Sequence, residues 1–309
     1  MKKVFIDGSV GTTGLRIYER LSARKDLQIL SLPEEKRKDA LARKEMLNSV
    51  DLAFLCLPDD AAREAAQMVE NPSVTLIDAS TAHRTLPDWA YGFPELSPAF
   101  EEKILLSNRI AVPGCHASGF IALVYPLLEE GILSAERLLT AHSITGYSGG
   151  GKKMIADYES ENRSALLGAP RQYGIAQAHK HLPEMTKITG LKNAPTFSPI
   201  VADFYSGMEV TVPLFKEYLN FGNMEAVKEI YRSRYQTKLV RYVENADENG
   251  FLSAAALSGK DGMQIEVHGN DERILLVARY DNLGKGASGA AIECMNMKLG
   301  VKKEEGLVL

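Results

Sequence analysis

The first third of the chain alternates short apolar segments with segments of helical periodicity. Four segments have the pattern of short strands: residues 3–7, 27–32, 51–57 and 74–78. Residues 51–57 are nearly all apolar, as a strand covered on both faces must be, and residues 74–78 repeat this pattern. Helix-sized segments separate them, including residues 15–21, where apolar side chains recur at helical spacing. Strands joined in this way imply right-handed crossovers, so the pattern predicts a parallel, doubly wound α/β sheet from residue 1 to about 110.

The remaining two thirds follow a different pattern. Strand candidates arrive here with fewer helices between them, at residues 138–144, 197–201, 209–214, 239–243, 264–267 and 274–280. This succession predicts a mixed or antiparallel sheet with helices on one face. A glycine-rich segment, residues 282–289, then leads into an apolar helix at residues 290–299, which we expect to return to the first domain.

Composition and charge favour a small-molecule partner. The 309 residues include 36 Lys and Arg against 40 Asp and Glu, a net charge of −4, which provides no basic field for nucleic acid or an anionic membrane. No apolar run approaches the roughly 20 residues that a membrane span needs. The three cysteines are sparse and odd in number, as suits a reducing compartment, so we expect a cytoplasmic protein.

A glycine-rich turn follows the first predicted strand. Such a turn lets backbone amides at a helix N-terminus approach a pyrophosphate, although glycines here can also serve the turn alone. The spacing is G-x-x-G-x-x-G, which departs from the usual dinucleotide motif G-x-G-x-x-G. The candidate cofactor-binding residues are Gly8, Ser9, Gly11, Thr12, Thr13 and Gly14.

The segment after the second predicted strand indicates whether the protein prefers NAD or NADP. An acidic residue there would bind the ribose 2′-hydroxyl, whereas cations would bind a 2′-phosphate. The chain reads Pro-Glu-Glu-Lys-Arg-Lys at residues 33–38, and its basic trio favours NADP, with Arg37 as the phosphate ligand. Two alternatives to this interpretation remain. The mixed-charge run can simply be the solvated face at the start of a helix, or Glu34 or Glu35 can contact the ribose.

Cys115 is the candidate nucleophile. It follows Pro113 and Gly114, where an apolar helix over residues 120–128 is about to begin. The positive end of a helix and its unpaired N–H groups stabilise a thiolate, and the same groups can bind an oxyanion. Cys56, within an apolar strand, and Cys294, within the last helix, fit buried packing positions instead.

The best proton partners for this thiol are His179 and His181, which are followed by Pro183 and Glu184. The pair could also bind a metal, but no second cluster shows metal-site spacing, so we expect no metal. His116 is adjacent to Cys115, and we expect it to line the pocket because consecutive side chains diverge at a helix start. The other histidines fit surface or packing positions: His83, His142 and His268.

Taken in order, these motifs resemble the short form of the N-acetyl-gamma-glutamyl-phosphate reductases. The motifs are the N-terminal glycine turn, residues 77–84 (IDASTAHR), 91–96 (YGFPEL), 113–115 (PGC), 179–184 (HKHLPE) and 282–289 (NLGKGASG). The resemblance implies a Rossmann-type dinucleotide-binding domain at residues 1–115, completed by residues 285–309. It also implies an α+β catalytic and oligomerisation domain at residues 116–284, of the type found in semialdehyde and glyceraldehyde-3-phosphate dehydrogenases.

The resemblance implies reductive dephosphorylation of N-acetyl-L-glutamyl 5-phosphate by NADPH, in arginine biosynthesis. Cys115 would form a thioester, His181 or His179 would transfer protons, and Glu184 would orient one of the histidines. The choice between the two histidines stays open.

Further site residues follow from the same resemblance. Arg84 would bind the substrate phosphate or carboxylate, with Lys152 and Ser118 as further substrate-binding candidates. Asn282 and Gly286 would lie near the nicotinamide. Val112 stands where many relatives have Asn, and residues 116–118 (HAS) replace their Tyr-Pro-Thr, as the short form shows.

Two other functions remain to be tested. The first is that of an aspartate-semialdehyde dehydrogenase or a related reductase of another acyl phosphate, although the H-x-H-x-P-E motif speaks against it. The second is that of a nucleotide-binding regulator without catalysis, which would need neither Cys115, His181 nor Arg84. We expect a homodimer or homotetramer, as is usual for enzymes of this construction.

Overall fold

The computed structural model describes all 309 residues, which form two compact units. The first unit comprises residues 1–94, 98–113 and 287–307, and the second comprises residues 95–97, 114–286 and 308–309. Cys115, which the sequence placed at the end of the first domain, therefore belongs to the second unit, whereas most of the C-terminal segment belongs to the first.

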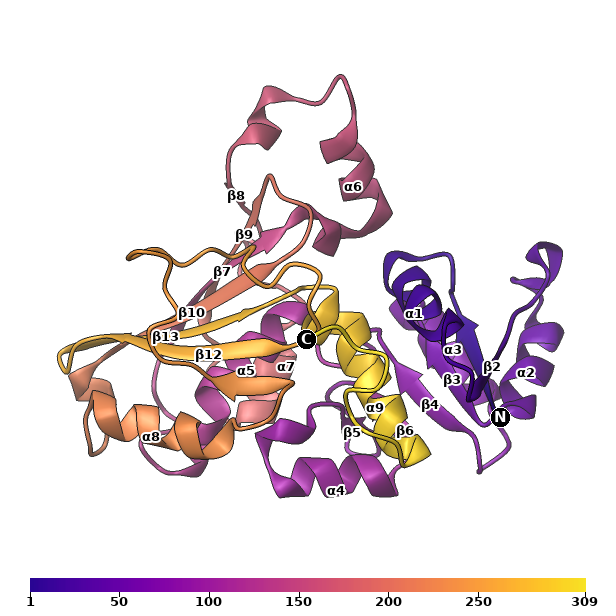
Figure 1. Cartoon of the computed structure of the whole chain (residues 1–309), viewed down its shortest axis with the longest axis horizontal. Helices are drawn as coiled ribbons and strands as arrows, with labels where there is room; N and C mark the ends of the chain where they lie inside the picture. Colours follow the sequence, from indigo (N-terminus) through magenta and orange to yellow (C-terminus); the bar gives the residue numbers. More distant parts are fainter. The chain divides into compact units, whose positions relative to one another are not determined.

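The first unit is built on a parallel sheet of six strands (Figure 1). Its order is β2 (Leu27–Leu30), β1 (Lys2–Asp7), β3 (Leu52–Leu55), β4 (Thr75–Asp78), β6 (Arg109–Ala111) and β5 (Ala90–Tyr91). Its helices are α1 (Thr12–Ser22), α2 (Ala40–Ser49), α3 (Asp59–Met68), α4 (Pro98–Leu106) and α9 (Gly289–Leu299). Val4 of β1 pairs with Ile29 of β2 and Leu52 of β3, so the strand order reverses at β1. In open α/β sheets, ligands bind in the crevice at the carboxyl ends of the strands beside such a reversal.

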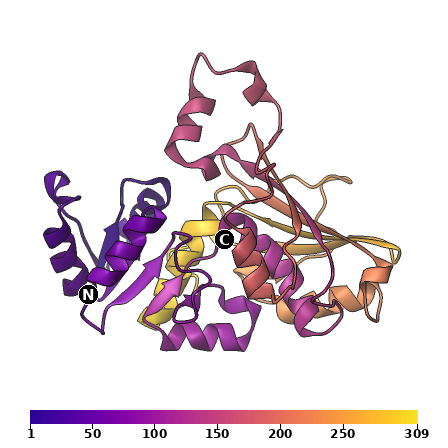
Figure 2. The ribbon, with the colours of Figure 1, turned by 180° about the vertical axis from the view of Figure 1, so that it is seen from behind.

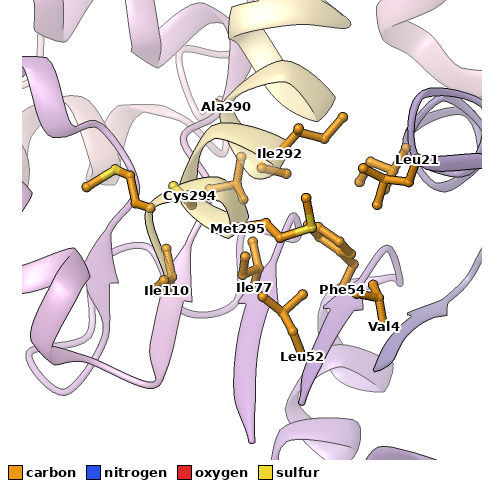
Figure 3. Close-up of a cluster of buried hydrophobic side chains, with 14 of the residues drawn as sticks. Val4, Leu21, Leu52, Phe54, Ile77, Ile110, Ala290, Ile292, Cys294 and Met295 are labelled. Atoms are coloured by element: carbon orange, nitrogen blue, oxygen red, sulfur yellow. The ribbon is translucent and has the colours of Figure 1, made fainter. Parts of the chain in front are cut away.

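Both faces of this sheet are covered by apolar side chains. The C-terminal helix α9 covers one face, where Met295 and Cys294 pack with Ile77 and Ile110 from the strands (Figure 3). Leu47 of α2 belongs to the cluster on the other face. This arrangement confirms the predicted doubly wound sheet, and Cys294 has the buried packing position expected of it.

The second unit contains a mixed sheet of seven strands. Its order is β11 (Val240–Tyr242), β12 (Met263–Gly269), β13 (Arg273–Tyr280), β10 (Met208–Phe215), β7 (Thr140–Gly146), β9 (Thr196–Ala202) and β8 (Arg171–Gln172). Strands β7 and β9 pair in parallel, as do β11 and β12, and the other neighbours are antiparallel. The mixed sheet predicted from the sequence is thereby confirmed.

Helices of the second unit lie on one side of this sheet (Figure 1, Figure 2). They are α5 (Cys115–Glu129), α7 (Leu182–Thr189) and α8 (Met224–Arg234), whereas α6 (Gly151–Glu159) lies in a segment that projects beyond the sheet edge. Alternate residues of β10 show that the opposite face is left half-exposed, because Val210 and Val212 are buried whereas Glu209 and Thr211 are not.

Short helical turns connect these elements: η1 (Glu34–Lys36), η2 (Pro94–Leu96), η3 (Tyr147–Gly150), η4 (Ala165–Gly168), η5 (Lys216–Tyr218) and the π-helical turn η6 (Gly284–Ser288). No helix of the structure is long and apolar enough to cross a bilayer.

Candidate active site

Cys115 is the first residue of α5, as the sequence predicts. The preceding residue, Gly114, is the N-cap, and no side chain caps this end of the helix. The first-turn N–H groups have no partner within the helix, and the helix dipole places partial positive charge at the same point. A thiolate at Cys115, and an oxyanion formed on a carbonyl bound to it, are both stabilised by this environment.

The backbone around Cys115 is fixed by two contacts. The Glu184 Oε1 atom accepts a hydrogen bond from the Gly114 N–H at 2.8 Å, and the Glu184 side chain is buried in the first turn of α7. A Cβ atom on Gly286 would lie 3.1 Å from the Cys115 Cβ, so glycine permits this close approach. The bond to Gly114 gives Glu184 a role in placing the nucleophile, beyond the histidine orientation expected from the sequence.

The turn that contains Gly286 is anchored by a buried ion pair that the sequence analysis missed. Lys285 Nζ lies 2.8 Å from both carboxylate oxygens of Glu95, and both side chains are almost completely buried. Both residues fall within recognised motifs, but the pairing joins positions 190 residues apart, which no local pattern reveals.

Three histidine rings gather beside α5. The ring centroids of His179 and His181 lie 4.8 Å apart, and that of His116 lies 5.5 and 5.6 Å from them. His179 Nδ1 accepts a hydrogen bond from the His181 N–H at 3.2 Å, which leaves the proton of a neutral His179 ring on Nε2. Burial lowers the pKa of His179, and the charge of Lys180 lowers it further, so the ring is neutral and can accept a proton near neutral pH.

His116 is held at both ring nitrogens. Its Nδ1 lies 2.7 Å from Ser143 Oγ, and its Nε2 lies 2.6 Å from the Tyr173 hydroxyl. Burial, with smaller contributions from the charges of His179 and Lys180, lowers the pKa of His116 to about 3. His116 is therefore a fixed neutral residue, in keeping with the expectation that it lines the pocket.

We expect this buried ring to make the folded state sensitive to acid. Because the pKa of His116 is 6.5 when exposed and about 3 when folded, the unfolded chain binds a proton below pH 6.5 that the folded chain does not. The free energy of unfolding should therefore fall as the pH falls through this window, by about 2 kcal/mol at pH 5 from this residue. Urea unfolding at pH 7 and at pH 5 measures this change. Between these two pH values, the free energy of unfolding should fall less in His116→Gln than in the wild type. Equal losses in the two proteins would contradict the assignment.

Two tyrosines beside Cys115 were also missed from the sequence. The Tyr280 hydroxyl accepts a hydrogen bond from the Gly119 N–H at 3.0 Å and donates one to the Cys115 carbonyl. Burial raises the pKa of Tyr173, and the nearby charge of Cys115 raises it further, so its hydroxyl stays protonated. Tyr280 lies two residues before the motif that begins at Asn282, which could have directed attention to it, whereas Tyr173 lies in no recognised motif.

Asn282 and Ser118 have partners within the protein. The Asn282 amide accepts a hydrogen bond from the Gly207 N–H at 2.9 Å and donates one to Ser148 Oγ at 3.0 Å. Ser118 is fully buried, and its hydroxyl donates to the Gly114 carbonyl at 3.1 Å. The Ser118 bond therefore helps to shape the turn at Cys115, whereas Asn282 connects Gly207 with Ser148 of η3. Lys152 is exposed in the first turn of α6.

In the first unit, the glycine turn has the geometry of a cofactor cradle. Gly8 has φ +90°, and a Cβ on it would lie 2.2 Å from the Cys56 carbonyl oxygen. A Cβ on Gly14 would lie 2.4 Å from the Gly8 carbonyl oxygen, so neither position admits a side chain. Gly11 caps α1 without a side chain, which leaves the first-turn N–H groups available to a pyrophosphate. Ser9, Thr12 and Thr13 of the turn are partly exposed.

Charged groups flank this turn. Arg37 is exposed and directly follows η1, after β2, where a 2′-phosphate would bind. Asp7, just before the turn, accepts hydrogen bonds from Nε and Nη2 of Arg43 at 3.1 and 2.9 Å, and both side chains are buried. Burial raises the pKa of Asp7, although Arg43 opposes the shift. The pKa of the Cys56 thiol is also raised by burial, which fits its expected packing position.

Arg84 is buried and contacts backbone carbonyl groups. Its Nε donates to the Val112 oxygen at 2.8 Å and its Nη2 to the Ala79 oxygen at 3.1 Å. Two of its donors therefore stabilise the segment that leads to Pro113. Nearby, His83 lies 2.6 Å from Asp78 and stacks on Trp89, which makes it a packing residue.

No group of three or more His, Cys, Asp or Glu side chains is arranged to hold a metal ion. The start of α5 offers the chemistry of the Cys115 thiol and of the first-turn N–H groups.

Comparisons with known proteins identify the family. Residues 21–104 match the family described as semialdehyde dehydrogenase, NAD binding domain, and residues 115–282 match semialdehyde dehydrogenase, dimerisation domain. The chain is 45% identical to N-acetyl-gamma-glutamyl-phosphate reductase 2 of Nostoc sp., over 99% of both chains. It is 46% identical to N-acetyl-gamma-glutamyl-phosphate reductase of Rhizobium meliloti, over 96% of this chain and 98% of the relative. The chain belongs to the N-acetyl-gamma-glutamyl-phosphate reductase family.

Solved structures confirm the fold of this family member. Aspartate semialdehyde dehydrogenase II of Vibrio cholerae, in complex with ASA, aligns with a TM-score of 0.72 at 16% identity, over 97% of this chain and 98% of that one. Aspartate semialdehyde dehydrogenase with NADP from Candida albicans aligns with a TM-score of 0.69 at 15% identity, over 97% and 100%. Family, fold class and a dinucleotide-binding domain are thus as the sequence motifs predict.

Proposed function

We propose that this chain catalyses the NADPH-dependent reductive dephosphorylation of N-acetyl-L-glutamyl 5-phosphate, in arginine biosynthesis. The products are N-acetyl-L-glutamate 5-semialdehyde and phosphate. The observation that carries the proposal is the helix-opening Cys115, which is followed by His116, whose ring lies 5.5 and 5.6 Å from those of His179 and His181, in a chain whose relatives bear the name of this reductase.

The first step uses Cys115 as the nucleophile. Its Sγ attacks the carbonyl carbon of the acyl phosphate, a C–S bond forms, and the C–O bond to phosphate breaks. The charge that develops on the carbonyl oxygen is stabilised by the first-turn N–H groups of α5. A thioester remains on Cys115, and phosphate leaves.

The second half of the reaction releases the aldehyde. NADPH, when bound, supplies a hydride that reduces the thioester carbon. The hemithioacetal on Cys115 then collapses, and the sulfur leaves as the thiolate. His179 or His181 takes the thiol proton before the attack and donates the proton that the reduction consumes, because a neutral imidazole can act as both base and acid.

The cofactor and substrate groups are assigned as follows. The cradle of Gly8, Ser9, Gly11, Thr12, Thr13 and Gly14 binds the pyrophosphate, and Arg37 binds the 2′-phosphate of NADP. Lys152 and Arg84 bind anionic groups of the substrate, with Ser118 and Glu184 shaping the turn at Cys115. Gly286, which lies close to Cys115, and Asn282 are assigned to contacts with the nicotinamide. A thiol nucleophile and an NADPH supply suit the cytoplasm.

The reverse reaction tests the proposal. NADPH absorbance is followed with N-acetylglutamate semialdehyde, phosphate and NADP, and separately with aspartate semialdehyde. Phosphate-dependent NADPH formation with the N-acetylated aldehyde supports the proposal. Turnover with aspartate semialdehyde alone would transfer the chain to the sister reaction, and no turnover with either would favour a nucleotide-binding regulator.

The matched dimerisation domain indicates an oligomer, and we propose a homodimer or homotetramer. The half-exposed face of the seven-stranded sheet is the surface that we assign to this contact, because helices cover only the other face. It carries the exposed apolar side chain of Leu275 on β13.

We expect Leu275→Arg to convert the oligomer to smaller species, because it buries a charge in a contact of roughly 800 Å² per subunit. Light scattering after gel filtration measures the mass. Leu106→Arg, at an apolar side chain that is 78% exposed in the first unit, is the matched control. A monomeric wild type, or an unchanged mass for Leu275→Arg, would contradict the assigned surface.

A further inference from the structure

A tyrosine hydroxyl bridges the first turn of α5. Tyr280 accepts a hydrogen bond from the Gly119 N–H at 3.0 Å and donates one to the Cys115 carbonyl. These two backbone groups, four residues apart, are the pair that the second hydrogen bond of α5 joins, after the first bond from the Ser118 N–H to the carbonyl of the N-cap Gly114. The hydroxyl therefore acts on the one turn that carries the nucleophile.

The bond to the Cys115 carbonyl has a consequence at the other end of the same peptide group. That group is planar and contains the N–H of His116, which is among the N–H groups at the start of α5. A donor to the carbonyl fixes the plane, and it also polarises the group so that its N–H becomes a stronger donor. Through one peptide unit, Tyr280 thus affects an N–H group that is available to the thiolate and the oxyanion.

The chain is built to hold this hydroxyl in place. Tyr280 is the last residue of β13 and pairs with Met208 of β10 and Met263 of β12, and its side chain is completely buried. A Cβ on Gly119 would lie 2.7 Å from the Tyr280 oxygen, so glycine leaves the room that the bridge needs. Burial raises the pKa of Tyr280, and the hydroxyl consequently remains a donor throughout the working pH range.

We propose that Tyr280 is a positioning residue for the reductase reaction, which orients and polarises the Cys115–His116 peptide so that its N–H stabilises the thiolate and the oxyanion. This inference rests on the proposed function for its effect on turnover, but its effect on the thiol can be measured without any substrate.

The same helix provides a matched control. The Tyr235 hydroxyl donates to the Ala122 carbonyl of α5 at 2.6 Å, and Tyr235 is likewise almost completely buried. Tyr235→Phe therefore removes the same atom, from the same type of bond, on the same helix, but seven residues away from Cys115. A general loss of helix packing would affect both variants, whereas a positioning role affects only Tyr280→Phe.

Both variants and the wild type should be compared in two assays. The rate of Cys115 alkylation by iodoacetamide, measured against pH, reports the thiolate, and steady-state kinetics report kcat and KM. In Tyr280→Phe we expect the midpoint of alkylation to move up by about half to one pH unit. We also expect kcat to fall about tenfold to hundredfold, with KM for the acyl phosphate changed less than about threefold. Tyr235→Phe should match the wild type in the alkylation midpoint, in kcat and in KM.

Gly119→Ala provides a second variant, which keeps Tyr280 but displaces its hydroxyl, and it should shift both assays in the same direction. If Tyr280→Phe does not fold, Gly119→Ala alone tests the positioning role of the Tyr280 hydroxyl. An alkylation midpoint and kcat within experimental error of the wild type in the folded variants would overturn the proposal. A wild type without reductase activity, but with the alkylation shift in Tyr280→Phe, would overturn the proposed function and leave the positioning of the thiol intact.

Discussion

Cys115→Ala is expected to abolish phosphate-dependent reduction of NADP, with a loss of roughly 10⁴-fold or more. The reason is that no other group at the start of α5 can form the acyl intermediate. The N–H groups of the first turn remain in the variant, but they then have no covalent intermediate to stabilise. Binding of NADPH, measured by fluorescence titration, should stay close to that of the wild type, because the glycine turn is untouched.

Cys56→Ala is the control for this experiment. Burial raises the pKa of the Cys56 thiol, so it contributes no thiolate near neutral pH, and its loss should leave most of the activity. Cys115→Ser should be almost as inactive as Cys115→Ala, because a hydroxyl is a far weaker nucleophile than a thiolate. Activity above about 1% in Cys115→Ala would contradict the thioester mechanism.

Gly8→Ala is expected to have the second large effect, on cofactor binding and on stability together. Its Cβ would lie 2.2 Å from the Cys56 carbonyl oxygen, and its φ of +90° is a conformation that side chains disfavour. The turn must therefore move, and the N–H groups of α1 move with it. We expect NADPH binding to weaken by more than about 30-fold and the free energy of unfolding to fall by about 2 to 4 kcal/mol.

Gly300→Ala separates the effect of a positive φ from the effect of the close contact with the Cys56 carbonyl oxygen. Gly300 also has a positive φ, of +69°, and lies in the same unit, but a Cβ there would meet nothing within 4 Å. This variant should therefore lose only about 1 kcal/mol and bind NADPH normally. Urea unfolding and NADPH titration of both variants measure the difference. Equal effects at the two glycines would show that the close contact with Cys56 is unimportant.

The sequence predicted those parts of the fold that depend on local patterns. The apolar segment 51–57 contains β3, and residues 74–78 contain β4, because strands buried on both faces are mostly apolar. Cys115 could be placed at a helix start from the Pro-Gly that precedes it. The glycine-rich segment before Lys152 forms η3 and the start of α6.

The contacts that position the site could not be predicted in the same way. The bond from the Gly114 N–H to Glu184 spans 70 residues, and the bond from the Gly119 N–H to Tyr280 spans 161. Such pairs depend on how strands and helices pack in three dimensions, and neither residue type nor spacing along the chain indicates them. The motifs thus identified the reacting groups, whereas the structure was needed to find the groups that hold them.

The place of α9 in the first unit also has a consequence for the order of folding during synthesis. Met295 and Cys294 pack against strands of which the first, β1, begins at Lys2 (Figure 3). The part of this apolar face that α9 covers therefore stays exposed on the ribosome until nearly the whole chain has been translated, although Ile17 and Leu21 of α1 belong to the same cluster. The second unit, whose strands end at Tyr280, has most of its residues before α9 is made. In this chain the domain that is synthesised first completes its core last, and the nascent protein must keep an exposed sheet from aggregating in the meantime.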